Sequence, residues 1–270
     1  PNTMSLAVQS GEIDVAWRFL SADQISELEG IEGLNIGMID GGGIRFLQIN
    51  KTMAPTDDPN VARAIAASID RDEISDTVFG GQVAPLYSMV PPGFLGATDA
   101  FETMYASPNL DLANEFLADS GYTADNPLKL TVWYPPEHYG AATASWMQII
   151  EKQLEATGAI AVELKAQEWS TYITALVGGE SYSVSVLGWF FDYPDPSNYL
   201  DPFVYNKGMG NNLTAPAEGS LTGVPINEKA GELVDLLTAA DVETDTEARV
   251  ELYKQAQDLY AELAPTIPLF

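Results

Sequence analysis

The sequence predicts an α/β fold, because short apolar strands alternate with amphipathic helices along most of its 270 residues. Strands separated by helices in this way are typical of βαβ units and of a largely parallel sheet. Hydrophobic residues make up 46% of the chain, which is enough for a sizeable core. No apolar run reaches the length of about 18 residues that a membrane-spanning helix requires.

The strands are predicted from apolar or alternating runs that are bounded by glycine, proline or polar residues. In chain order they cover 11–17, 33–50 with a break at Gly41–Gly43, 128–134, 159–166, 181–189 and 266–270.

The helices are predicted from capping residues followed by apolar positions at helical spacing. Asp58 can cap a helix that starts at Pro59, and Asp70 with Glu73 has the spacing of a capping box. Asn109 can cap a third helix that Gly121 ends. Further helices are expected at 142–158, 168–179, 228–240 and 246–264.

The charge of the chain excludes several classes of partner. Lys and Arg total 12 against 39 Asp and Glu, which gives a net charge of −27. Such a protein is repelled by phosphate backbones and by anionic membrane surfaces, so we expect no nucleic-acid partner. The chain has no cysteine and a single histidine, His138. Thiolate chemistry is therefore excluded, and we expect no metal site and no cofactor.

Six segments occur in the order seen in a known family. They are "LQINKTMAPTDDPNVARAIAASIDRDEISDTVFGG", "VPPG", "LADSGY", "QEW", "LGWFFDYPDPSNYL" and "RVELYKQAQDLYAELAPTIPLF". Together they resemble the peptide-type extracellular solute-binding proteins, which are the oligopeptide-, dipeptide- and nickel-binding components of ABC importers. Each segment alone is weakly specific, but the full series in this order is a strong indication.

The resemblance implies a fold and a division of the chain. Members of this family have the two-lobe, type II periplasmic-binding-protein fold and are roughly twice as long as this chain. By this comparison, residues 1–50 are the tail of lobe I with a hinge strand, and 51–263 are lobe II. Residues 264–270 are the strand that returns to lobe I. We therefore expect a fragment that holds mostly lobe II.

The stretch "GWFFD" resembles the G-W-x-x-D pattern of the family. The resemblance implies that Trp189 lines the ligand pocket and that Asp192 receives the free amino end of a bound peptide. A fixed carboxylate suits this role, because an ammonium group that leaves water needs a counter-charge. "DYPDP" is also favourable turn chemistry, and we expect Asp195, which precedes Pro196, to serve as a turn or cap residue.

Four more side chains are candidate ligand contacts. The resemblance makes Trp169 a pocket aromatic, and it places His138 near the far end of a peptide. Each residue also has an explanation that involves no ligand: Trp169 can cover a helix start, and His138 can be a solvated loop residue. Phe190 and Tyr193, with Trp133 and Tyr134, could face a sugar or lie in the core.

The sequence departs from the family at one point. Some oligopeptide binders carry arginines before and within the last strand of lobe II, and these reach the ligand carboxylate. The stretch "TALVGGESYSVSVLGW" contains none. We therefore expect this wall to contribute little to carboxylate recognition.

These features together predict a binding protein and no enzyme. It would capture peptides outside the cytoplasmic membrane by lobe closure and deliver them to the permease subunits of an ABC transporter. The expected state is a monomer, periplasmic or extracellular, with the option of a lipid anchor. The alternatives are an oligosaccharide or metal-chelate binder of the same family and, from another class, a carboxylate-dependent hydrolase.

Overall fold

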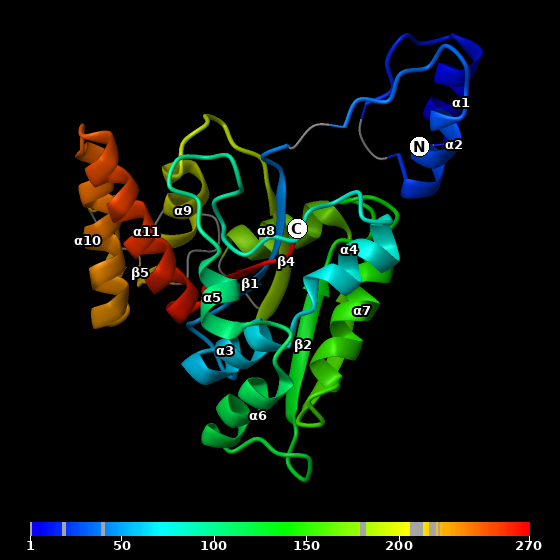
Figure 1. The fold of residues 1–270 in the computed structure, drawn as a ribbon. Coiled ribbons are helices and arrows are strands. Elements are labelled where there is room, and N and C mark those ends of the chain that lie inside the picture. The colour runs from blue at the N-terminus through cyan, green and yellow to red at the C-terminus, as the bar shows by residue number, and fades with distance from the viewer. Residues whose placement is uncertain are drawn as a thin grey trace.

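The computed structural model describes residues 2–17, 20–38, 41–178, 182–205, 213–215, 220 and 222–270. Within these residues the main body is built on a five-stranded sheet with the order β3-β2-β4-β1-β7, packed with helices (Figure 1). Its strands are β1 (Ile44–Ile49), β2 (Leu128–Tyr134), β3 (Ile160–Ala166), β4 (Val184–Trp189) and β7 (Thr266–Pro268). The predicted α/β class is therefore confirmed.

The direction of β1 differs from the sequence prediction. β2 is parallel to β3 and β4, whereas β1 is antiparallel to both of its neighbours, β4 and β7. The expectation of a largely parallel sheet is wrong for this central strand. A single helical crossover forces consecutive strands to be parallel. β1 is instead joined to the rest of the sheet through four helices, which impose no such direction.

The strands predicted nearest the N-terminus do not form. Gly11–Trp17 and Gly33–Met38 are neither helix nor strand, and Val15 and Trp17 are 74% and 67% exposed. Ile39 and Asp40, in the second of these predicted strands, lie outside the described residues. An isolated extended segment has no neighbour to take up its backbone hydrogen bonds, so the apolar pattern alone does not make a strand.

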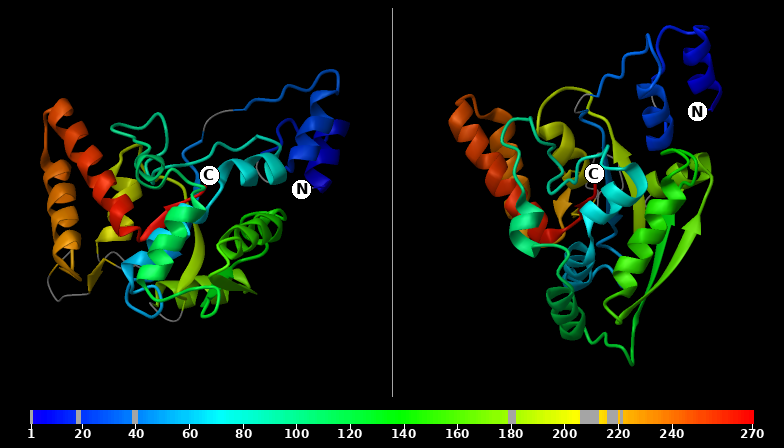
Figure 2. Two further views of the ribbon diagram at one scale, coloured as in Figure 1. Left: turned by 60° about the horizontal axis from the view of Figure 1, so that its bottom comes forward. Right: turned by 45° about the vertical axis from the view of Figure 1, so that its right-hand side comes forward.

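The helices surround the sheet, and a first pair stands apart from it. They are α1 (Asn2–Ser10), α2 (Ala22–Glu29), α3 (Pro59–Ser68), α4 (Arg71–Phe79), α5 (Ala100–Tyr105), α6 (Leu110–Asp119), α7 (Thr143–Glu155), α8 (Trp169–Val177), α9 (Ser197–Val204), α10 (Glu228–Val242) and α11 (Thr246–Leu263). The α1–α2 pair projects from the body on an extended segment (Figure 2). Gln82 Nε2, just after α4, donates to the Ala22 carbonyl at 3.4 Å.

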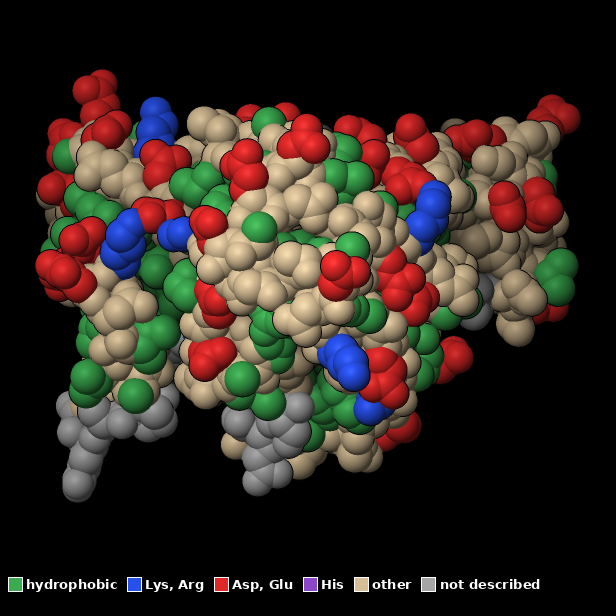
Figure 3. Space-filling view, turned by 90° about the horizontal axis from the view of Figure 1, so that it is seen from below, with side chains coloured by type: hydrophobic (Ala, Val, Ile, Leu, Met, Phe, Trp, Pro, Cys, Tyr) green, Lys and Arg blue, Asp and Glu red, His purple; other side chains and the backbone are tan. Residues whose placement is uncertain are grey.

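The surface carries the acidic excess of the composition. Acidic side chains are distributed across the face in Figure 3, and Lys and Arg are sparse there. In the part of the chain that the structure describes, no helix combines the length and apolar character needed to cross a membrane.

The predicted helix caps are confirmed, with one change. Asp58 accepts from Asn60 N at 2.9 Å, and Asp70 accepts from Glu73 N at 2.9 Å. The return half of the capping box at Asp70 is absent, because Asp70 N donates to Gln153 Oε1 of α7 at 3.1 Å. Hydrogen bonds from Gln153 and Lys152 hold the pKa of Glu73 below its usual range. The expected local cap thus also joins α4 to α7.

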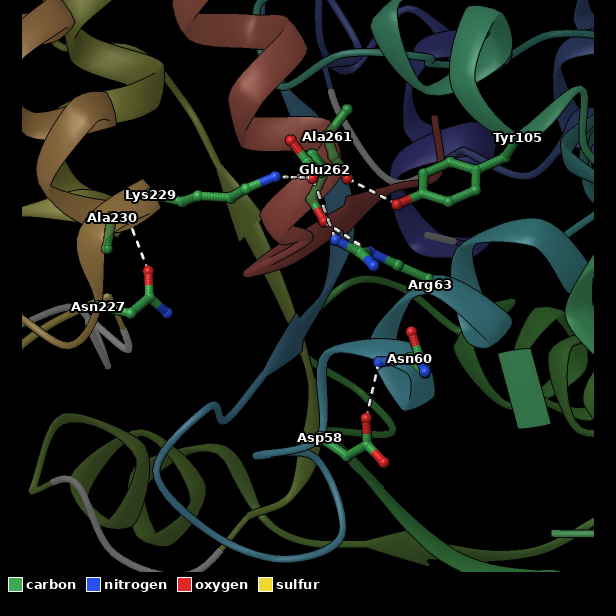
Figure 4. Close-up of polar contacts among 9 residues, drawn as sticks. All are labelled: Asp58, Asn60, Arg63, Tyr105, Asn227, Lys229, Ala230, Ala261 and Glu262. Carbon is green, nitrogen blue, oxygen red and sulfur yellow. Dashed lines mark hydrogen bonds and ion pairs between the residues drawn. The ribbon is translucent and has the colours of Figure 1, made fainter. Parts of the chain in front are cut away.

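Three helices meet at Glu262 in the last turn of α11 (Figure 4). The helix dipole disfavours a carboxylate at this end. Nη2 of Arg63, in α3, lies 3.3 Å from Oε1 of Glu262. Lys229 of α10 forms a second ion pair with the same Glu262 oxygen. The neighbouring Ala261 carbonyl accepts a hydrogen bond from the Tyr105 hydroxyl at 2.7 Å. Two cations therefore compensate the unfavourable position and tie α11 to α3 and α10.

Arg71, the first residue of α4, is the largest buried cation of the body and is 1% exposed. Its Nε donates to the carbonyl oxygens of Leu86 and Pro268, both at 2.9 Å. Its Nη1 donates to Ser107 Oγ at 2.7 Å. Burial lowers the pKa of Arg71 to about 10, so the group stays charged at neutral pH. One side chain thus connects α4, the loop before α5, and the edge strand β7.

We predict that Arg71→Met lowers the free energy of unfolding by about 3 kcal/mol, because buried carbonyl groups lose their donor. Urea denaturation of the full-length protein measures this loss. Arg63→Met is the control, since its side chain is 25% exposed, and we expect a cost below about 1 kcal/mol. Equal losses in the two variants would contradict the role given to Arg71.

Candidate functional site

The candidate residues gather at one edge of the sheet. β2, β3 and β4 share one direction, so their carboxyl ends meet, and His138, Trp169 and residues 190–193 follow these three ends. β1 runs the other way and brings its first residues, including Arg45, to the same edge. We call this the carboxyl edge. In open α/β sheets, ligands bind outside the carboxyl ends of the parallel strands.

His138 and Trp169 form one stacked pair at the carboxyl edge. Their ring centroids are 3.4 Å apart and their planes differ by 5°. Tyr139 meets Trp169 edge-on at 5.9 Å, and its hydroxyl accepts a hydrogen bond from Gly188 N at 2.8 Å. Burial, and then the nearby charge of Arg45, lower the pKa of His138, so the imidazole is neutral at pH 7. The structure therefore places both predicted side chains against each other.

Arg45 extends this pair into a row. Its Cζ lies 4.4 Å from the Tyr139 ring centroid and 5.3 Å from that of Phe190. In the β1–β4 register Arg45 stands opposite Gly188. A Cβ at Gly188 would lie 2.7 Å from Arg45 Nη1, so the missing side chain makes room for the guanidinium. We call Trp169, His138, Tyr139, Arg45 and Phe190 the aromatic row.

Trp189 does not belong to this row. Successive side chains of a strand alternate between faces, so Trp189 points away from the face that carries Gly188 and Arg45. Its ring packs edge-on against Phe203 of α9 at 5.3 Å, and its Nε1 donates to Asn198 Oδ1 at 3.1 Å. The same oxygen accepts from Asp192 N at 3.0 Å. Asn198, which is 4% exposed, thus fixes the loop after β4.

The other candidates of the loop lie at the surface. Phe190 and Tyr193 are 52% and 49% exposed, and Asp192 is also exposed. The Tyr193 hydroxyl lies 3.3 Å from Ser197 Oγ. The backbone N–H of Asp192 is held by Asn198, so its exposed side chain extends from a fixed backbone position. This arrangement can offer a negative charge to a ligand.

Asp195 has the structural role expected for it. Its carboxylate accepts from Ser197 N at 3.0 Å and binds the Arg249 guanidinium through two hydrogen bonds of 2.7 and 3.0 Å. Burial alone would raise the pKa of Asp195, but the hydrogen bonds from Arg249 and Ser197 outweigh it and hold the pKa below its ordinary value. The loop is thereby anchored to α11.

The segment before β1 crosses directly over this loop. A Cβ at Gly42 would lie 2.4 Å from the Phe191 ring, and a Cβ at Gly43 would lie 2.5 Å from the Phe190 ring. The Tyr199 hydroxyl of α9 donates to the Gly42 carbonyl at 2.7 Å. Only residues without a side chain allow this close approach, so the glycines belong to the architecture of the site.

Sequence reasoning did not find Arg45, Tyr139 or Asn198. Tyr139 follows His138 in "EHYG", and that adjacency was the one available signal. Arg45 and Asn198 reach the site through strand register and helix packing, which a linear pattern does not reveal. The rings of Trp133 and Tyr182 pack together with their centroids 5.0 Å apart. Lys165 Nζ lies over the Trp133 ring, 5.5 Å from its centroid.

Two other features bear on what the site can hold. Among the described residues, no cluster of three or more His, Asp or Glu side chains could bind a metal ion. A shallow hollow of about 420 Å3 lies between α4 and α7, and none of its lining residues belongs to the aromatic row. It is lined by Thr77, Val78, Ala142, Ser145, Gln148, Ile149 and Lys152, which include no aromatic and no acidic group.

Comparison with known proteins identifies the family. Residues 1–211 match the model for bacterial extracellular solute-binding proteins, family 5, middle part. The chain belongs to this family.

Individual relatives agree with this assignment. The chain is 27% identical to the oligopeptide-binding protein OppA of Bacillus subtilis (strain 168), over 100% of this chain and 47% of that protein. It is 30% identical to the di/tripeptide-binding protein 2 of Pseudomonas aeruginosa (strain UCBPP-PA14), over 82% and 39%. A crystal structure of Haemophilus influenzae OppA in complex with RPPGFSPFR has the same fold, with a TM-score of 0.80 at 24% identity. That match covers 100% of this chain and 50% of that one.

The chain thus spans about half the length of the relatives it matches. The predicted fold class, part of a type II periplasmic-binding-protein fold, is confirmed.

We predict that Gly42→Ala lowers the free energy of unfolding by about 1–3 kcal/mol, because the added methyl group collides with the Phe191 ring and the buried Tyr199 hydroxyl. Thermal or urea unfolding measures the change. Gly37→Ala is the matched control, since a Cβ there has nothing within 4 Å. Equal stability of the two variants would contradict the close packing of the segment at Gly42 against the Phe191 ring.

We predict that Asp195→Asn destabilises the protein at pH 7 by about 1–2 kcal/mol, through the lost ion pair with Arg249. A depressed pKa in the folded state means that the ionised carboxylate stabilises the fold above the ordinary pKa of 3.8. This contribution disappears as the pH falls below that value. The difference between wild type and variant, measured by denaturation, should therefore shrink in acid. A constant difference from neutral pH down to about pH 2 would contradict the assignment.

Proposed function

We propose that the full-length protein containing this chain captures peptides outside the cytoplasmic membrane and delivers them to an ABC permease. The observation that carries the proposal is the carboxyl edge, where the exposed residue Asp192 follows Phe190 of the aromatic row by two positions in the loop after β4. Membership of a family of extracellular solute-binding proteins supports it. The named peptide-binding relatives support peptide as the ligand class.

The mechanism is closure of two lobes around the ligand, with no bond made or broken. We propose that residues 1–50 are the tail of lobe I, 51–263 are lobe II, and 264–270 return the chain to lobe I. β1 and β7 are adjacent antiparallel strands, so the chain enters and leaves the main body side by side. Such a pair of crossings suits a hinge between lobes.

Each part of the edge has a proposed task. Asp192 receives the ammonium group of the peptide, which needs a fixed counter-charge once the lobes exclude water. Trp169, His138, Phe190 and Tyr193 present apolar surface to the peptide. Trp189 supports the loop from the opposite face of the sheet through its bond to Asn198.

Calorimetry on the full-length protein tests the proposal with a pool of free tripeptides and the same pool N-acetylated. Free peptides should bind, and acetylated peptides should bind at least about 30-fold more weakly, because removing one partner of a buried charge pair costs about 2–5 kcal/mol. Asp192→Asn should produce the same loss for free peptides. Asp125→Asn, on an exposed turn before β2, is the matched control and should bind as the wild type does.

Two outcomes would count against the proposal. Equal binding of free and acetylated peptides would remove the ammonium role of Asp192. Binding of neither pool would remove the peptide assignment and favour a saccharide or a metal chelate.

A further inference from the structure

We propose that Tyr172, a buried residue of α8, is a positioning residue that holds the stacked Trp169 and His138 rings in place for the peptide, with support from Tyr182. This inference rests on the proposed peptide-binding function, and it adds the residues that fix two of the proposed ligand contacts. Tyr172 and Tyr182 are 0% and 6% exposed, so both act from beneath the surface.

The sheet has a gap at the carboxyl edge that a tyrosine hydroxyl fills. The register of β2 with β4 ends at Ser185, although β4 continues to Trp189. Backbone groups that are buried need hydrogen-bond partners. At the next residue of β4 the Tyr172 hydroxyl supplies them, because it accepts from Val186 N at 2.8 Å and donates to the Val186 carbonyl at 2.6 Å. One phenol from α8 thus takes the place of β2.

The same tyrosine lies beside Trp169 on α8. Residues three apart on a helix are neighbours on its surface, and the Tyr172 and Trp169 rings have centroids 6.1 Å apart with planes that differ by 28°. Trp169 in turn carries the His138 ring at 3.4 Å. A hydroxyl that is fixed on β4 therefore determines where α8 presents the stacked pair.

Tyr182 restrains both Tyr172 and the start of α8. Its ring packs against that of Tyr172, with centroids 5.1 Å apart and planes that differ by 17°. Its hydroxyl donates to Oε1 of Gln167, two residues before Trp169. Tyr172 is thus confined by a neighbouring ring as well as by its hydroxyl, and the residues that lead into Trp169 are tied to the same cluster.

This support matters because the stacked pair lies at the surface. Trp169 is half-buried and His138 is exposed. Side chains that are already fixed lose less freedom when a ligand orders them, so the residues that hold them contribute to affinity without touching the ligand. Removing the Tyr172 hydroxyl should therefore weaken peptide binding.

Calorimetry with a tripeptide on the full-length protein tests the inference through Tyr172→Phe, which keeps the ring and removes the hydroxyl. The affinity should fall about 5- to 30-fold, because the ring that carries Trp169 loses its anchor on β4. Tyr105→Phe is the matched control. Its hydroxyl is equally buried and donates to the Ala261 carbonyl at 2.7 Å, between α5 and α11, so this variant should bind as the wild type does.

The NMR signals of the His138 ring provide a readout that general destabilisation would not move. Stacking on an indole shifts imidazole protons upfield, and burial lowers the pKa of His138. In Tyr172→Phe the upfield shift should shrink and the pKa should move toward its ordinary value, because the ring becomes more solvated. Both should stay unchanged in Tyr105→Phe. Comparison with His138→Gln assigns the signals.

A double-mutant cycle tests the route from Tyr172 to the ligand. In a Trp169→Ala background, Tyr172→Phe should change the affinity by less than about twofold, because the effect passes through Trp169. Should Tyr172→Phe not fold, as judged by circular dichroism, Tyr182→Phe decides by the same calorimetry and NMR. It releases Gln167 and should move affinity and His138 signals in the same direction.

The outcomes separate this inference from the proposed function. If wild type binds the tripeptide and Tyr172→Phe matches it in affinity and in the His138 signals, the positioning role is overturned while peptide binding stands. An equal loss in Tyr105→Phe, or an undiminished loss in the Trp169→Ala background, would also overturn it. Failure of the wild type to bind peptide would overturn the proposed function and this inference with it.

Discussion

The pairing of β1 on both of its edges is the constraint on which the rest of the structure depends. β1 lies between β4 and β7 and runs against both. Its interior position buries Phe46, Leu47 and Ile49 completely. Because its direction is reversed, its amino end lies beside the carboxyl ends of the parallel strands. The segment that enters the main body therefore lies against the loop that carries the candidate ligand groups.

That loop is held from three directions before any ligand binds. Asn198 fixes the backbone of Asp192, Arg249 of α11 holds Asp195, and the crossing at Gly42 packs on Phe191. A loop whose backbone is already fixed loses less freedom on binding than a mobile one, which favours affinity. A loop that touches the incoming segment can also respond when that segment moves, which suits the lobe closure that we propose.

Local signals in the sequence predicted the elements that local chemistry determines. The caps at Asp58, Asp70 and Asn109 form as expected, because each involves residues close together in the chain. The strand expected at 11–17 fails because a strand needs a partner that the pattern does not specify. Arg45 was missed for the same reason: its place depends on register with a strand far along the chain.

A crystal structure of the full-length protein with a saturating tripeptide tests the central claim most directly. The account predicts that the peptide lies at the carboxyl edge, with its ammonium group in hydrogen-bond contact with Asp192. A peptide bound elsewhere, such as in the hollow between α4 and α7, or bound at the edge without contact to Asp192, would contradict it.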